Sequence, residues 1–141
     1  MESGGDFEII NGERRFHPVS DEVSEILSAL QSVRVPAVPG EYDLHALIGQ
    51  ALAERGIAFV HEARLAPGRR VDFLSGRVAI EVKKSKPPRA RLLEQSAKYL
   101  SSDSVGALIV VSQRAISLPR TIAGKPVYLL SLDRLWGVSL P

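Results

Sequence analysis

Cysteine is absent from the 141 residues, and aromatic side chains make up only 6% of them. The lack of cysteine excludes disulfides and cysteine-based zinc sites, and three scattered histidines argue against a histidine-rich zinc site. There is no G-x-x-x-x-G-K loop, which argues against an ATP-driven motor within this chain. No apolar run approaches the roughly 20 residues that cross a membrane, and no charged and then apolar leader opens the chain. We therefore expect a soluble, cytoplasmic protein without membrane contacts.

The length suits one domain with a sizeable core. Residues 7–16 have the pattern of a hairpin around the turn signal Asn11-Gly12, and a helix is expected from Ser20 to about Val33. We assign residues 1–35 to this N-terminal extension and residues 36–141 to the core. The extension is too small to bury a core alone, so we expect it to pack on the core or to pair with another subunit. A homodimer is therefore a hypothesis.

The spacing of apolar residues in the core predicts an α/β fold, with helices on both sides of a mixed sheet. The expected order is one helix, three strands, a helix, two strands and a final helix. These elements are a helix within 41–56, a strand over 59–65, two strands joined at Ser75-Gly76 within 71–85, a helix over 89–100, strands over 106–112 and 126–132, and a short helix over 131–138 with Ser131 as a cap.

An acid-x-Lys tripeptide lies on the second of the two joined strands. Side chains alternate along a strand, so Glu81 and Lys83 share one face. The opposite face is apolar and marks the buried side; it carries Val78, Ile80 and Val82. Taken alone, this tripeptide is more simply an exposed charge pair.

Asp72 lies on the preceding strand. If the turn is even in length, with Leu74 opposite Arg77, then Asp72 pairs with Ala79 and shares the face of Glu81. The two carboxylates are then diagonal neighbours, about 7–8 Å apart at Cβ. Carboxylate oxygens at this separation can hold one Mg²⁺ or Mn²⁺ ion.

Such a cation would offset the charge that builds on phosphate oxygens during hydrolysis and would acidify a bound water. Lys83 could then orient the attacking water or stabilise the transition state. The arrangement of Asp72, Glu81 and Lys83 therefore indicates metal-dependent hydrolysis of a phosphodiester by a metal-activated water.

A further metal ligand is expected from the preceding helix. His45 lies at the edge of its apolar stripe and Glu41 lies one turn earlier, and we prefer His45. The structural alternatives are a half-buried histidine and an acid favoured at a helix N-terminus. Glu62 on strand 59–65 is a weaker candidate, because an acid on a half-exposed strand usually faces solvent.

Gln95 and Tyr99 are four residues apart on the helix 89–100 and share a face. An amide and a phenol beside a charged strand end can bond a phosphate, a nucleobase or the catalytic groups. The simpler alternative is that Tyr99 packs with Leu92 and that Gln95 is solvated.

This order of motifs resembles the PD-(D/E)XK nuclease superfamily, and more narrowly its RecB-like branch. The resemblance spans roughly Glu41 to Ser112 and rests on the ordered set His45, Asp72, Glu81-Val-Lys83 and Gln95-x-x-x-Tyr99.

The resemblance implies a restriction-endonuclease-like core and metal-dependent cleavage of DNA. It implies that Asp72 and Glu81 are metal ligands, that Lys83 is the catalytic lysine and that His45 is the ligand from the first helix. Two positions depart from the pattern: Val71 stands where the name of the motif has proline, and Gly68 lies four rather than three residues before Asp72.

Basic residues gather around the proposed site. Residues 64–98 hold ten basic and three acidic side chains, whereas the rest of the chain holds eight and thirteen. A polyanion would be drawn to this region, although a solvated basic face is the simpler alternative. No aromatic residue interrupts the run Lys84 to Arg91, so we expect contacts to the DNA backbone rather than to bases. The candidate DNA-binding residues are Arg69, Arg70, Lys84, Lys86, Arg89, Arg91 and Lys98.

The sequence thus predicts a Mg²⁺- or Mn²⁺-dependent DNA nuclease. The alternative is a non-catalytic DNA-binding or assembly module, a subunit of a larger repair, recombination or phage-type complex. An RNA-directed hydrolase is a third hypothesis.

Overall fold

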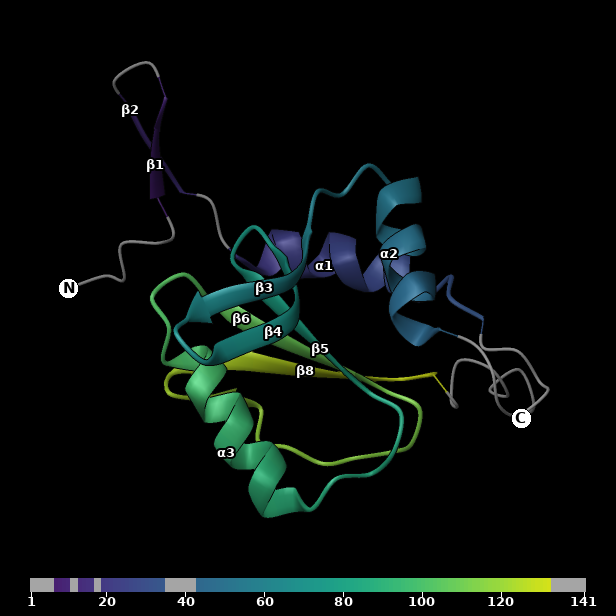
Figure 1. Ribbon diagram of the computed structural model, residues 1–141. Coiled ribbons are helices and arrows are strands. Elements are labelled where there is room, and N and C mark those ends of the chain that lie inside the picture. The colour runs from purple at the N-terminus through teal and green to yellow at the C-terminus, as the bar shows by residue number, and fades with distance from the viewer. Residues whose placement is uncertain (1–6, 11–12, 17–18, 35–42, 133–141) are drawn as a thin grey trace.

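The computed structural model describes residues 7–10, 13–16, 19–34 and 43–132. Within these ranges the chain forms a six-stranded mixed sheet, a separate two-stranded sheet and three helices (Figure 1). The elements are β1 (Phe7–Ile10), β2 (Glu13–Phe16), α1 (Val19–Leu30), α2 (Leu44–Glu54), β3 (Val60–Ala66), β4 (Arg69–Ser75), β5 (Val78–Lys83), α3 (Arg89–Leu100), β6 (Ala107–Ser112), β7 (Thr121–Ile122) and β8 (Lys125–Ser131).

The large sheet has the strand order β3-β4-β5-β6-β8-β7. Strands β3, β4 and β5 form an antiparallel meander, whereas β5, β6 and β8 are parallel. Helix α3 makes the connection between the parallel neighbours β5 and β6, as a parallel pair requires. The carboxyl ends of β5 and β6 therefore meet at one edge of the sheet, where Lys83 is the partner of Ser112.

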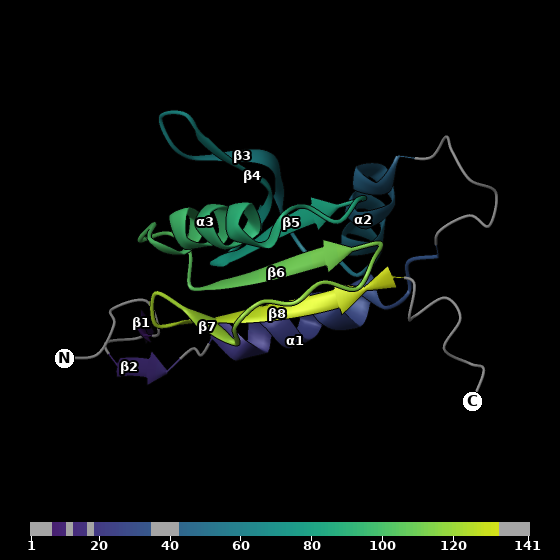
Figure 2. The same ribbon diagram turned by 90° about the horizontal axis from the view of Figure 1, so that it is seen from below.

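Helices cover both faces of the sheet, which confirms the predicted α/β class. Figure 2 shows α1 on one side of the parallel strands and α3 on the other. One apolar cluster joins α1 and α2 to alternate residues of β5 and β6, and the second joins α3 to the intervening residues. All six residues of β6 are buried, because each of its faces meets one of these clusters.

Helix α2 begins later than the predicted segment. Asp43 caps it, and its side chain accepts a hydrogen bond from the Ala46 backbone N–H at 3.2 Å. Glu41 lies outside the described residues, as does most of the final helix predicted over 131–138, whose proposed cap Ser131 is the last residue of β8. Strand β7 was not predicted, because two residues are too short to show a periodic pattern.

The β4–β5 turn differs from the predicted register. Leu74 pairs with Ala79 and not with Arg77, so the turn residues are Gly76 and Arg77 rather than Ser75 and Gly76. Gly76 has a φ of +58°, which suits the first central position of a two-residue hairpin turn. The Arg77 backbone N–H also donates a 3.2 Å hydrogen bond to Glu22 on α1, which holds the turn against that helix.

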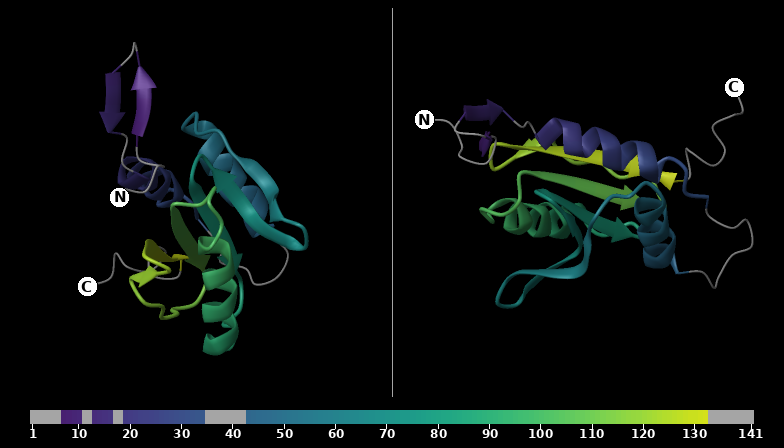
Figure 3. Two further views of the ribbon diagram at one scale, coloured as in Figure 1. Left: turned by 90° about the vertical axis from the view of Figure 1, so that its left-hand side faces the viewer. Right: turned by 90° about the horizontal axis from the view of Figure 1, so that it is seen from above.

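The β3–β4 hairpin rotates relative to the rest of the sheet at Glu62 and Asp72. Glu62 has a φ of +55° and lies between two paired positions of the β3–β4 ladder, His61 opposite Phe73 and Ala63 opposite Val71. Phe73 packs in the α1 and α2 cluster, whereas Val71, two residues away, packs in the α3 cluster. The end of the hairpin consequently leaves β5 and leans to the α3 side of the sheet (Figures 2 and 3).

Within the described part of the chain, no helix combines the length and the apolar character needed to cross a bilayer.

Candidate functional site

Asp72 lies where β4 separates from β5. The β4–β5 ladder ends with Phe73 opposite Ile80, and one further step in that register would put Asp72 opposite Glu81. The Oδ2 atom of Asp72 accepts a 2.7 Å hydrogen bond from the Val82 backbone N–H, so the carboxylate replaces a backbone carbonyl at this point. The register of the β4–β5 ladder differs from the prediction by two residues, and the Asp72 carboxylate meets the backbone of β5 next to Glu81.

Glu81 is a buried carboxylate with a partner on each oxygen. Only 5% of the surface of Glu81 is exposed to solvent. The Nζ atom of Lys83 lies 2.9 Å from Oε2, and the hydroxyl of Tyr99 donates to Oε1 at 3.1 Å. The acid-x-Lys pair is therefore partly buried and in contact, unlike an exposed charge pair.

Two effects raise the pKa of Glu81 above its usual 4.5. Burial is the larger one and the negative charge of Asp72 is the second, while Lys83 and Tyr99 act in the opposite direction. The pKa of Tyr99 is also raised, by its own burial and then by the charge of Glu81. Tyr99 therefore keeps its proton and remains a hydrogen-bond donor to the carboxylate.

His45 reaches the same group from α2. Its Nε2 atom lies 3.8 Å from Oδ2 of Asp72, and its Nδ1 atom lies 2.9 Å from Nε2 of His61. The ring of His61 stacks on Phe73, with ring centres 4.7 Å apart. His61 was not among the predicted residues, because its contact with His45 joins β3 to α2 and has no counterpart in local sequence spacing.

Two other candidate residues, Glu62 and Gln95, make no direct contact with the Glu81 carboxylate. The Glu62 side chain is 54% exposed and forms a 3.3 Å ion pair with Arg70, as expected for a solvent-facing acid. Gln95 is half-buried beside Tyr99, and within the described residues no hydrogen bond joins its amide to Glu81.

The candidate metal ligands Asp72, Glu81 and His45 are only partly close to one another. Among the described residues, no three His, Asp or Glu side chains are close enough together to hold a metal ion. Asp72 is nevertheless within 4 Å of His45, and its charge acts on Glu81. Two carboxylates and an imidazole are suitable donors for Mn²⁺, and the carboxylates also suit Mg²⁺. Burial is the main cause of the raised pKa of Glu81, and the negative charge of Asp72, which a cation would offset, is the second.

A cleft of about 270 Å³ adjoins this group between the β3–β4 turn and α3. We call it the basic cleft. Tyr99, which bonds Glu81, is one of its lining residues, and Arg69 closes one side by donating to the Lys98 carbonyl and the Ser101 hydroxyl, each at 3.2 Å. The lining residues are Gly68, Arg69, Arg70, Arg91, Glu94, Gln95, Lys98 and Tyr99.

The predicted DNA-binding residues line two different cavities. Lys86 and Arg89 line a different cavity, and Lys84 is exposed without lining either of the two. Helical geometry explains part of this division, because Arg89 and Arg91 are two residues apart on α3 and so point in different directions.

Comparison of the chain with protein-family models, with curated proteins and with solved structures gives no match in any of the three.

The raised pKa of Glu81 predicts a pH-dependent stability. The folded state binds the Glu81 proton more tightly than the unfolded chain, so this contribution should lower stability as the pH rises from about 4.5 through the raised pKa. Glu81→Gln lacks the titrating group, so its free energy of unfolding should increase relative to wild type over that window. Urea unfolding in EDTA between about pH 4 and pH 8 measures this difference.

Glu94→Gln, which changes an exposed acid on the same helix as Tyr99, is the matched control. If the wild type instead gains stability relative to Glu81→Gln as the pH rises, the Glu81 carboxylate is stabilising and the argument from burial is wrong.

Proposed function

We propose that this protein is a metal-dependent DNA nuclease with a restriction-endonuclease-like core. The observation that carries the proposal is the buried pair of Glu81 and Lys83, 2.9 Å apart, beside Asp72 on the adjoining strand. Burial of an ionised pair costs free energy that a solvent-exposed pair avoids. Its position next to a second carboxylate is understandable if the group binds a cation and a phosphate.

Asp72 and Glu81, with His45, would hold Mg²⁺ or Mn²⁺. When bound, such a cation supplies Lewis-acid chemistry at the phosphate and at the attacking water. Asp72 is already oriented by the Val82 N–H, and Glu81 by the Tyr99 hydroxyl. These contacts fix the directions of both carboxylates before any ligand arrives.

Lys83 has a second role in this proposal. Its ammonium group now neutralises Glu81, and its side chain is still partly accessible. Close to a phosphodiester, it can donate a charge-assisted hydrogen bond to a phosphoryl oxygen, where negative charge develops during hydrolysis.

The basic cleft supplies contacts to the DNA backbone. Arg70, Arg91 and Lys98 line it next to Tyr99, so a strand lying in the cleft passes close to Glu81. Among the described residues the only aromatic lining side chain is Tyr99, which favours recognition of phosphates over recognition of bases.

A second function is a DNA-binding or assembly module that retains this fold without catalysis. It is favoured by the fact that Lys83 and Tyr99 already occupy both oxygens of Glu81. Such a module would serve as a subunit of a larger repair, recombination or phage-type complex.

The direct test is cleavage of linear, circular and branched DNA with Mn²⁺, Mg²⁺ or EDTA. We expect cleavage that EDTA abolishes and that Lys83→Ala lowers by about 100- to 1000-fold. Asp72→Asn should also abolish turnover but keep its melting temperature in EDTA, because asparagine retains an acceptor for the Val82 N–H and relieves the repulsion with Glu81. Arg120→Ala, an exposed change outside the basic cleft, is the control.

Tight DNA binding without cleavage under any metal would contradict the nuclease and support the binding module. Preference for RNA in the same assay would support an RNA-directed hydrolase. A large loss of melting temperature in Asp72→Asn without metal would show that Asp72 is structural.

Binding of DNA in the basic cleft predicts a specific salt dependence. Arg91→Ala and Lys98→Ala should each weaken binding to all sequences alike and reduce the slope of log K against log salt by about 1. Fluorescence anisotropy in EDTA measures this slope without cleavage, with Arg120→Ala as control. Unchanged slopes in both cleft variants would place the DNA elsewhere.

A further inference from the structure

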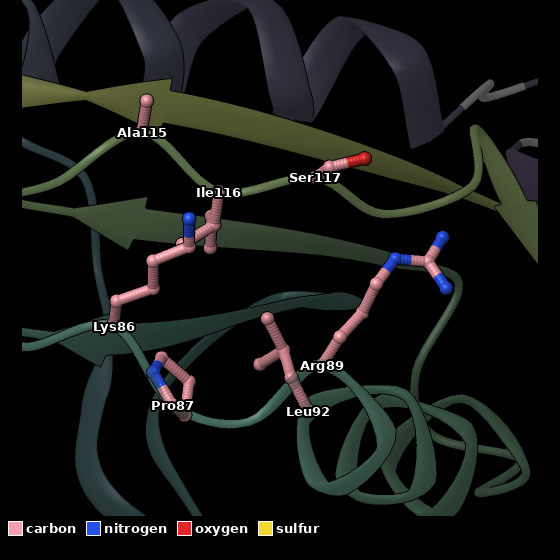
Figure 4. A pocket seen from close by; sticks show the side chains of 7 residues that line it. All are labelled: Lys86, Pro87, Arg89, Leu92, Ala115, Ile116 and Ser117. Carbon is pink, nitrogen blue, oxygen red and sulfur yellow. The ribbon is translucent and has the colours of Figure 1, made fainter.

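A second cavity, of about 420 Å³, lies on another side of α3 from the basic cleft. Figure 4 shows the side chains that line it: Lys86 and Arg89 lie on either side, and Pro87, Leu92 and Ile116 lie between them. We call it the strand-end cavity. Ala115 and Ser117 complete its lining.

The strand-end cavity is lined by residues from the two segments that follow the carboxyl ends of the parallel strands β5 and β6. Lys83 ends β5 and pairs with Ser112, which ends β6, and the Gln113 N–H donates to the Lys83 carbonyl at 3.0 Å. The segments that follow these strands supply the cavity lining on both sides.

The lining combines an apolar centre with positive charge at its rim. Lys86 and Arg89 are both exposed, and among the described residues no acidic side chain lines the cavity. Helix α3 also begins here, and its N-cap residue, Pro88, makes no side-chain hydrogen bond to the first turn. Its first N–H groups therefore add to the attraction for an anion. An anionic ligand with a flat apolar part complements this lining.

We propose that the strand-end cavity binds one nucleotide of an unpaired DNA strand. The base would lie between Pro87 and Ile116, over the buried Leu92. Lys86 and Arg89, on either side of the cavity, would hold the phosphates that flank the base. A volume of about 420 Å³ suits a single small ligand rather than a duplex. In a duplex, stacking and pairing keep the bases out of such a cavity, so the strand must be single or frayed.

This inference rests on the proposed function, because it names the form of DNA that the same site would act on. Lys86 is three residues from Lys83, a span of at most about 10 Å. A nucleotide in the cavity would therefore place a phosphate only a few nucleotides along the strand near Lys83 and Glu81. The proposal predicts a substrate with a single-stranded end.

The test is an NMR titration of ¹⁵N-labelled protein in EDTA with two probes of equal charge, a thymidine tetranucleotide and its abasic analogue. We expect the largest amide shifts at Lys86 and at residues 89–92 and 115–117, and binding of the thymidine probe about fivefold tighter than the abasic one, because the base buries apolar surface. Ile116→Ala should remove this preference. Lys86→Glu should weaken the binding of both probes, whereas Arg120→Glu should change the binding of both much less.

Equal affinity for the two probes, or shifts confined to other segments, would overturn the proposal. Equal binding of an acidic peptide with the same shifts would also overturn it and would indicate a protein-docking site. Because EDTA prevents cleavage, the two proposals can fail separately. If the protein cleaves DNA with a metal but these amide shifts are absent, the nucleotide site is wrong and the nuclease proposal stands. If the shifts are present but no metal supports cleavage, the nuclease proposal is wrong and the nucleotide site stands.

Discussion

The buried carboxylate of Glu81 is the constraint on which the candidate site depends. It lies on a central strand whose two faces are covered by helices, so its charge must be satisfied inside the protein. Lys83 and Tyr99 satisfy it, and Tyr99 thereby ties α3 to the sheet. Asp72 works in the opposite direction by adding negative charge. The group is held in place, yet it keeps an unfavourable charge that a cation would relieve.

The rotation of the β3–β4 hairpin connects the fold to this chemistry. At Asp72 the strand leaves its neighbour, which frees the carboxylate to accept from Val82 and to approach His45. Beyond that point the hairpin leans to the α3 side, where Arg69 bonds the end of the helix and helps to form the basic cleft. One local change of backbone direction thus creates both the acidic group and the positive surface beside it.

Local patterns predicted the regular elements well, and three-dimensional contacts explain the rest. The α3 bounds follow from periodicity. The hairpin register depended on which residues form the turn, and the contact with Glu22 that holds this turn comes from a distant helix. His61 was missed because its partner belongs to another element. The basic residues formed one group in the sequence but line two cavities, because helical geometry and chain connections separate them.

We propose that Asp72 and Glu81 share one divalent cation. A crystal soaked in Mn²⁺ and measured at an anomalous wavelength tests this claim most directly. We predict one strong anomalous peak about 2.2 Å from a carboxylate oxygen of each residue, with Lys83 displaced from its present contact with Glu81. Absence of a peak there, with the contact between Lys83 and Glu81 intact at saturating Mn²⁺, would contradict a shared cation site.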